Sequence, residues 1–237
     1  MPEPTSSPHR WNQIRRLPLH PGIQSLAQYE AALIQGTIDA ADYLHSVDAL
    51  DGLVVADFQA VHFHLFKGVH PWAGEFRSIG QLAVVAGYPA ADPGRIRREL
   101  ELTLLQTRQL LGAASGEAAP VLAALSFQHA RFERIHPFRD GNGRSGRTVL
   151  AVQFQSLFGH LPDFADQPAY REALRAANSG DLGPFMRFLA RNTSVALSAA
   201  PCPSPYRIAP RFLEGHETEP SLADDLAWSR SARRGTS

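Results

Sequence analysis

The sequence has a single cysteine, no excess of charge of either sign and no long hydrophobic run. Cys202 cannot form an intramolecular disulfide or a cysteine metal site, and its proline-rich surroundings predict a tail residue. Lys plus Arg and Asp plus Glu number 23 each, which argues against capture of nucleic acid or of an anionic membrane by bulk charge. We therefore expect neither nucleic acid nor a membrane as a partner.

Every apolar segment is shorter than the roughly twenty residues needed to span a bilayer. Residues 1–10 also lack the apolar core of a secretory signal. These absences predict a cytoplasmic protein, with later export by a specialised secretion system left open. The hydrophobic fraction of 44% is that of an ordinary globular protein, and 237 residues can bury a sizeable core.

The pattern between the two ends of the chain is helical. Apolar spacing and start signals predict helices from Leu26, from Phe58, from Asp92-Pro93, from Pro120, from the glycine turn at 141–143, around 169–177 and over 182–197. Val84 and Val85, set among glycines, predict a short β-hairpin within 76–88. Residues 1–10 and the stretch from about Ala199 are rich in Pro and Ser and predict unordered ends.

The sequence therefore predicts a mainly α protein. We divide it into a partly helical N-terminal extension (1–49), one domain (50–198) and a weakly ordered tail (199–237).

Twelve consecutive residues, 136–147, carry the residue types that nucleotide phosphate chemistry needs. Pro137 disfavours helical geometry in the residue before it, so a helix should end at His136 and present its ring to a cleft. The imidazole pKa lies near neutrality, which makes His136 the predicted general base. Asp140 offers a carboxylate of the kind that binds Mg²⁺ beside substrate phosphates.

The second half of this run predicts a phosphate site. Gly141, Asn142 and Gly143 allow positive φ and expose backbone N–H groups at the start of a helix, where the dipole favours anions. Arg144 and Arg147 lie three apart on that helix, and two guanidinium groups suit a polyphosphate. The run lacks Gly-Lys-Ser/Thr, so it is not a Walker A loop.

Each of these features alone is usually structural, because histidines often end helices, glycines often make turns and arginine pairs are mostly solvated. Their occurrence together, in an order that makes one site, favours function. His62 and His64 could suggest a metal centre with His129 and His136. On a helix, side chains at positions i and i+2 such as His62 and His64 point about 200° apart. We therefore favour the interpretation that these histidines are core or solvated residues.

The run resembles, position for position, the signature of the Fic domain, His-x-Phe-x-Asp/Glu-Gly-Asn-Gly-Arg-x-x-Arg. Residues 57–77, with Pro71-Trp72-Ala73-Gly74, are similar to the segment before the family's flap, and 177–185 resemble its closing helix. The resemblance covers about residues 50–195. It implies the Fic fold, a bundle of about six to eight helices with a short β-hairpin flap beside the active-site loop.

The resemblance also implies an activity, the transfer of AMP from ATP to a Tyr, Thr or Ser hydroxyl of a target protein. His136 would be the base, and Asp140 would hold Mg²⁺. Gly141, Asn142, Gly143 and Arg144 would contact the phosphates, and Arg147 the γ-phosphate. The flap near residues 77–88 would bind the target protein by strand pairing, with Ser78 and Ile79 touching the nucleotide.

Two alternatives stay open: a Fic-fold transferase of phosphate, UMP or phosphocholine, and a non-catalytic peptide-binding module. Many Fic enzymes are also restrained by a Ser/Thr-x-x-x-Glu-Gly/Asn helix whose Glu pairs with the second arginine. The nearest pattern here, Pro210-x-x-x-Glu214-Gly215, lacks the hydroxyl. We expect this Glu to come from a separate small antitoxin, with the chain as the toxin of a bacterial toxin–antitoxin pair. A tail-borne Glu214, or no restraint, are the alternatives.

Overall fold

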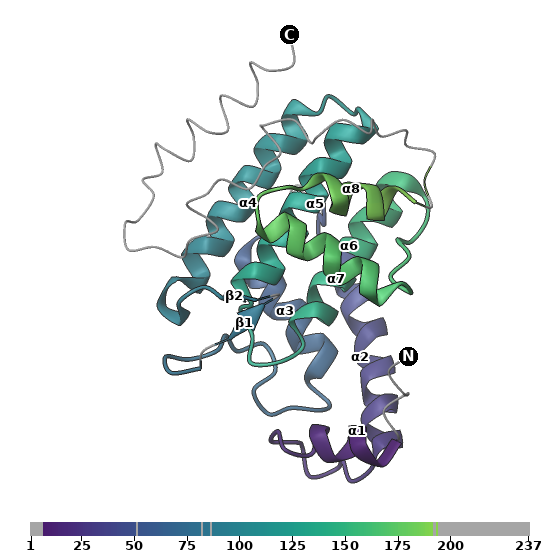
Figure 1. Ribbon diagram of the computed structural model, residues 1–237. Coiled ribbons are helices and arrows are strands. Elements are labelled where there is room, and N and C mark those ends of the chain that lie inside the picture. Colours follow the sequence, from purple (N-terminus) through teal and green to yellow (C-terminus); the bar gives the residue numbers. More distant parts are fainter. Residues whose placement is uncertain (1–6, 51, 82, 86, 192, 194–237) are drawn as a thin grey trace.

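One central helix, α5 (Ala118–Ile135), organises the protein. Every residue from 121 to 135 on it is buried, polar and charged side chains included. A helix that is buried on all sides must be enclosed by other elements. The computed structural model describes residues 7–50, 52–81, 83–85, 87–191 and 193, and within these α5 is surrounded by helices (Figure 1).

The described part of the chain is mainly α, as the sequence predicts. Its other helices are α1 (Ser7–Ile14), α2 (Leu26–Ser46), α3 (Val55–Phe66), α4 (Ile96–Ala113), α6 (Asn142–Phe158), α7 (Gln167–Asn178) and α8 (Gly183–Ala190), with a 3-10 turn, η1 (Pro93–Arg95), before α4. A two-stranded sheet, β1 (Val84–Val85) and β2 (Tyr88–Pro89), completes it.

Two hydrophobic clusters share α5 and α6. The first lies against α7 and α8 and includes Phe127, Phe154 and Phe185. The second lies against α2, α3 and α4 and includes Phe58 and Phe132. Figure 1 shows α7 and α8 crossing α5 and α6 on one side of the bundle. The loop that joins α5 to α6 is therefore anchored by both clusters.

Local signals account for several helix starts. The Asp92 carboxylate accepts a hydrogen bond from the Gly94 N–H, and Pro93 takes the first position of η1. The Ser25 hydroxyl accepts from the Gln28 N–H at the start of α2. At the start of α7, the Asp166 carboxylate accepts from the Ala169 N–H.

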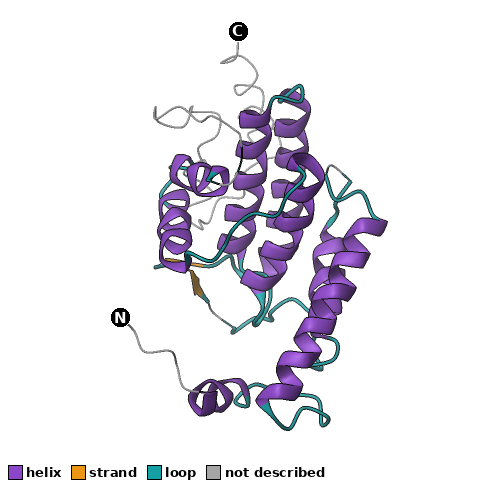
Figure 2. Cartoon of the chain, turned by 90° about the vertical axis from the view of Figure 1, so that its right-hand side faces the viewer, coloured by secondary structure: helices purple, strands orange, loops and turns teal. Residues whose placement is uncertain are grey.

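The prediction of an unordered N-terminus is wrong for residues 7–10, which belong to α1. Pro8 falls in the first turn of this helix, where a missing N–H costs nothing. The guanidinium of Arg10 also forms an ion pair with Glu30 of α2 at 2.7 Å. Figure 2 shows α1 at one end of the molecule.

The predicted hairpin is present, but its bounds differ. Val84 pairs with Pro89 and Val85 with Tyr88, so the second strand ends one residue beyond the predicted range. The first residue of the predicted range, Phe76, is not part of the hairpin. It forms an isolated antiparallel bridge with Phe138 of the loop between α5 and α6. This bridge brings the base of the hairpin beside the twelve-residue run.

The remaining sequence predictions concern the ends and the surface. Helix α8 ends at Ala190, short of the predicted 197. Residues 194–237 lie outside the described residues, and with them Cys202, Glu214 and the predicted tail. Among the described helices, none combines the length and the apolar character that crossing a membrane requires.

Candidate active site

His136 lies at the exit of α5, in the left-handed conformation with φ 52° and ψ 60°. Few residues other than glycine adopt positive φ, and Pro137 disfavours the right-handed helical region for the residue before it, so α5 ends here. His136 Nδ1 lies 3.4 Å from the Glu133 carbonyl oxygen, which can only accept, so Nδ1 carries the proton. Nε2 is thereby left as the proton acceptor that a general base needs.

Burial holds the pKa of His136 below its usual value of 6.5, while the hydrogen bond to the Glu133 carbonyl acts in the opposite direction. The lowered pKa keeps the imidazole neutral at neutral pH. This is the protonation state in which it can take a proton from a hydroxyl.

The Asn142 side chain closes the loop. Its Oδ1 accepts from the Phe138 N–H at 2.8 Å, and its Nδ2 donates to the Phe138 carbonyl oxygen, also at 2.8 Å. Asn142 is 1% exposed, so its side chain is buried where it shapes the loop. The contact of Asn142 with phosphates stays a prediction, and its backbone N–H at the start of α6 is the group available for it.

Arg77 ties the hairpin to the same loop. Its Nε donates to the His136 carbonyl oxygen at 2.7 Å, and its backbone N–H donates to the Pro137 carbonyl oxygen at 2.8 Å. The Nη1 and Nη2 groups donate to the carbonyls of Gln81 and Ala91, before and after the hairpin. One buried guanidinium thus holds both the backbone of His136 and the two ends of the hairpin.

Gly141 is the N-cap residue immediately before α6 and has φ 81°. A Cβ at this position would lie 2.4 Å from the ring of Phe66, so both conformation and space require glycine. The first intrahelical hydrogen bond runs from the Ser145 N–H to the Gly141 carbonyl. The N–H groups of residues 142–144 precede it and, with the helix dipole, form an anion-binding end.

Asp140 sits at this end of α6 with a partly exposed carboxylate. Its Oδ2 accepts from Arg144 Nη2 at 3.0 Å, and the Arg144 guanidinium also lies 4.5 Å above the Phe66 ring. The Asp140 carbonyl accepts from His62 Nε2 at 3.0 Å. Because the Gly74 N–H donates to His62 Nδ1, the proton of this ring is on Nε2.

His62 therefore fixes the backbone of the predicted metal ligand. Burial lowers the pKa of His62 to about 4, which keeps the ring neutral. Among the described residues, no group of three or more His, Cys, Asp or Glu side chains could hold a metal ion.

The structure thus brings His136, Asp140, Gly141, Gly143, Arg144 and Arg147 together in one loop and the first turns of α6. Ser78 and Ile79 follow Arg77, at the base of the hairpin. The Ser78 N–H donates to Gln81 Oε1, and Ile79 is 88% exposed. Their contact with a nucleotide stays a prediction.

The sequence did not indicate that Arg77 and His62 support the site. It also did not indicate that the Asn142 side chain holds the loop in place. His62 had one signal: it shares a helical face with Phe58, Val61 and Leu65, which predicts a ring directed inward. The partners of Arg77 lie 58 and 59 residues away at Ile135 and His136, and no local pattern indicates them.

A neutral histidine at a helix exit, an amide-rich helix start, a carboxylate and two arginines thus lie together on one helical domain, and these are the groups that the binding of phosphates beside a base requires. Residues 52–154 match the Fic/DOC family. This match bears out the predicted resemblance over these residues, and the solved structures that the chain resembles confirm the Fic fold.

Two curated relatives are named protein adenylyltransferase Fic. The one from Nematostella vectensis is 29% identical over 171 residues, covering 70% of this chain and 39% of that protein. The one from Drosophila persimilis is 27% identical over 186 residues, covering 76% of this chain and 34% of that protein. The chain thus spans less than half the length of these relatives.

Two solved structures share the fold. BepC from Bartonella tribocorum, with bound AMPPNP, superposes with a TM-score of 0.54 at 24% identity, covering 72% of this chain and 88% of that one. Fic-1 from C. elegans superposes with a TM-score of 0.56 at 24% identity, covering 73% of this chain and 50% of that one.

Proposed function

We propose that this chain is a protein adenylyltransferase, which transfers AMP from ATP to a Tyr, Thr or Ser hydroxyl of a target protein. One observation carries the proposal: a neutral histidine with Nε2 as acceptor and a helix start with two arginines are braced in the same loop. The names of the relatives from Nematostella and Drosophila support it.

The reaction follows from this arrangement. His136 Nε2 takes the proton of the target hydroxyl while its oxygen forms a bond to the α-phosphorus. The bond from the α-phosphorus to the bridging oxygen breaks, and pyrophosphate leaves. The amides of residues 142–144 and the guanidinium of Arg144 would bind the phosphates, and Arg147 would bind the γ-phosphate. Positioning and neutralisation of charge supply most of the catalysis.

A divalent cation fits the site. Mg²⁺ is commonly held by one or two carboxylates together with substrate phosphates, and the Asp140 side chain is 40% exposed at the anion-binding end of α6. Asp140 would hold the ion, which would neutralise charge on the phosphates. The side chain of Arg144, now paired with Asp140, would then be shared with the phosphates.

The target protein would bind at the hairpin. Val84 of β1 is 72% exposed and Ile79 is 88% exposed, so the hairpin offers apolar side chains beside a strand edge. An extended segment of the target can pair with such an edge and place its hydroxyl near His136. Arg77 supports this assignment because it links the hairpin to the backbone of His136.

The test is transfer of radiolabel to proteins of a cell lysate with Mg²⁺ present. ATP labelled at the α-phosphate should label a target, whereas ATP labelled at the γ-phosphate should not. The variant His136→Ala should lower the transfer by about 10²- to 10⁴-fold, the usual contribution of a positioned base. Chelation of Mg²⁺ by EDTA should abolish it.

The exposed His45 of α2 provides a matched control, and His45→Ala should keep full transfer. Label from the γ-phosphate would support phosphate transfer instead. Label from neither position would overturn adenylylation. The alternatives would then be the transfer of another group or a non-catalytic peptide-binding role.

The source of restraint is a further part of the proposal. The sequence contains no Ser or Thr four residues before a Glu, so a separate antitoxin would supply the glutamate that competes with the γ-phosphate for Arg147. Co-expression with a small neighbouring gene product that carries Ser/Thr-x-x-x-Glu-Gly should suppress the labelling described above. Unchanged labelling would contradict the toxin–antitoxin pairing.

A further inference from the structure

Both arginines of the twelve-residue run end against a tyrosine from a helix outside the family match at 52–154. Arg144 Nη1 donates to the hydroxyl oxygen of Tyr29 on α2 at 3.1 Å. The Arg147 guanidinium lies 5.7 Å from the ring centroid of Tyr170 on α7. Each tyrosine is 4% exposed, so both phenols are fixed in the core.

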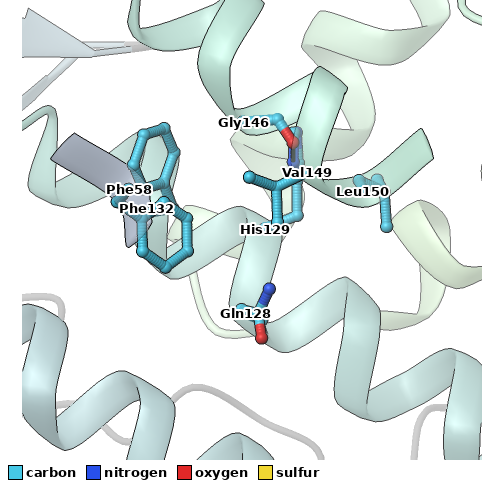
Figure 3. Close-up of a pocket in the computed structure, with 7 residues that line it drawn as sticks. All are labelled: Phe58, Gln128, His129, Phe132, Gly146, Val149 and Leu150. Carbon is cyan, nitrogen blue, oxygen red and sulfur yellow. Dashed lines mark hydrogen bonds between the residues drawn. The ribbon is translucent and has the colours of Figure 1, made fainter. Parts of the chain in front are cut away.

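His129 sets the direction of the hydrogen bonds around Tyr170. Its Nδ1 lies 3.2 Å from the Gly146 carbonyl oxygen, so Nδ1 carries the proton, and Figure 3 shows the two residues meeting where α5 faces α6. His129 Nε2, 2.8 Å from the Tyr170 hydroxyl, must then accept the phenol proton. The lone pairs of the Tyr170 oxygen are left to accept from Arg147.

This direction holds across the physiological range. Burial lowers the pKa of His129 to about 3, so the ring stays neutral, and burial raises the pKa of Tyr170, so the phenol keeps its proton. The Tyr170 phenol therefore donates to His129 and His129 Nδ1 donates to the Gly146 carbonyl, which leaves the Tyr170 oxygen as an acceptor beside Arg147.

A phenol is a particular kind of partner for an arginine. It accepts one hydrogen bond and fixes the guanidinium, yet it is neutral and itself offsets none of the positive charge. A carboxylate would fix the side chain and also offset part of the charge that a phosphate needs, as Asp140 does for Arg144 at 3.0 Å. Glu133, the carboxyl near Arg147, is a weak competitor, because burial raises its pKa to about 7.

The two phenols lie beside different arginines and belong to different helices. Tyr29 belongs to α2, which packs against α3 and α6, and Tyr170 belongs to α7, which packs against α5 and α8. An added Cβ on Gly143 would lie 2.9 Å from Nη1 of Arg147, so that guanidinium folds back over the glycine turn. Arg144 instead lies over Phe66.

We propose that Tyr29 and Tyr170 are positioning residues that hold Arg144 and Arg147 separately, so that the two arginines bind different phosphates of one nucleotide. This inference rests on the proposed function, since it takes ATP as the ligand. Tyr29 positions the arginine that contacts the phosphates shared by ADP and ATP. Tyr170 positions the arginine that contacts the γ-phosphate, which makes it a determinant of selectivity for the triphosphate.

The test is calorimetric titration of the full chain with Mg-ADP and with Mg-AMPPNP. Tyr170→Phe keeps the ring and removes the oxygen, so it should weaken AMPPNP binding by about 3- to 10-fold and change ADP binding less than twofold. Tyr29→Phe should weaken the binding of both nucleotides by a similar factor.

Tyr43→Phe is the matched control, because the Tyr43 hydroxyl of α2 donates to Asp57 at 2.6 Å and not to an arginine. It should leave both affinities unchanged even if it lowers stability. Equal losses for the two nucleotides with Tyr170→Phe, or an unchanged ADP affinity with Tyr29→Phe, would overturn the division between the arginines. A wild-type chain that binds neither nucleotide would instead overturn the proposed function together with this inference.

Discussion

Three buried or half-buried histidines owe their roles to backbone partners. In His136 and His129, Nδ1 faces a carbonyl oxygen and Nε2 is the acceptor. In His62 an amide N–H occupies Nδ1, and Nε2 is the donor. Nε2 is thus a proton acceptor in two of these rings and a donor in the third. The backbone hydrogen bond at Nδ1, and not the residue type, decides which.

Glu133 gives a prediction at this scale. Burial raises its pKa from 4.5 to about 7, and His129, Tyr170 and Arg147 are the polar groups that surround it. Between these two pH values the folded state binds a proton that the unfolded state has released, so this group lowers stability as pH rises. Glu133→Gln should therefore stabilise the protein more at pH 8 than at pH 5, by on the order of 2 kcal/mol.

Chemical denaturation at several pH values measures this difference. The exposed Glu117, just before α5, offers the control, and Glu117→Gln should leave the pH dependence unaltered. A constant difference between Glu133→Gln and the wild type across this range would show that Glu133 is ionised throughout.

At the scale of the element, α6 is flanked by two left-handed glycines, Gly141 just before it with φ 81° and Gly159 just after it with φ 76°. A Cβ at Gly159 would have no atom within 4 Å, whereas at Gly141 it would clash with the Phe66 ring. Gly159→Ala should cost about 1 kcal/mol of stability from conformation alone.

Gly141→Ala should cost at least about 1 kcal/mol more, because it adds a steric clash of the overpacking kind. It should also weaken nucleotide binding, since the helix start must shift. Thermal unfolding of the two variants measures the difference. Equal losses would show that the Phe66 ring moves aside freely.

Much of this element could be predicted from the sequence because its signals are local. Pro137 indicates the end of α5, and the glycine turn indicates the start of α6, each within a few residues. The side chains that brace the site could not be predicted. Tyr29 lies 115 residues from Arg144, and Arg77 lies 59 from His136, so only the folded chain brings them together.

The hairpin was placed only in part for a similar reason. Val84 and Val85 give a local strand signal, but the pairing of Phe76 with Phe138 depends on tertiary contact. The N-terminal helix was missed because Pro and Ser suggest disorder, although a proline in the first turn is compatible with a helix.

At the scale of the whole molecule, the two hydrophobic clusters share α5 and α6, so neither can unfold alone without exposing the other. Phe185 belongs to the first and Phe58 to the second, at 0% and 2% exposed. Phe185→Ala and Phe58→Ala should each cost about 3–5 kcal/mol and lower the same single unfolding transition.

Differential scanning calorimetry distinguishes the two cases. Two separate transitions in either variant would show that the clusters are independent folding units. A conservative Phe58→Leu, which leaves a smaller cavity, should lower the same transition by a smaller amount.

The hydrogen bonds of Arg77 couple the hairpin to the loop that follows α5. Its guanidinium donates to the carbonyls of Ile135 and His136 and also to those of Gln81 and Ala91 on either side of the hairpin. Arg77 therefore connects the hairpin to the loop between α5 and α6, so the two segments should move together. A displacement of the hairpin would therefore also displace the carbonyl of His136, and under the proposed function target binding would be coupled to the alignment of this histidine.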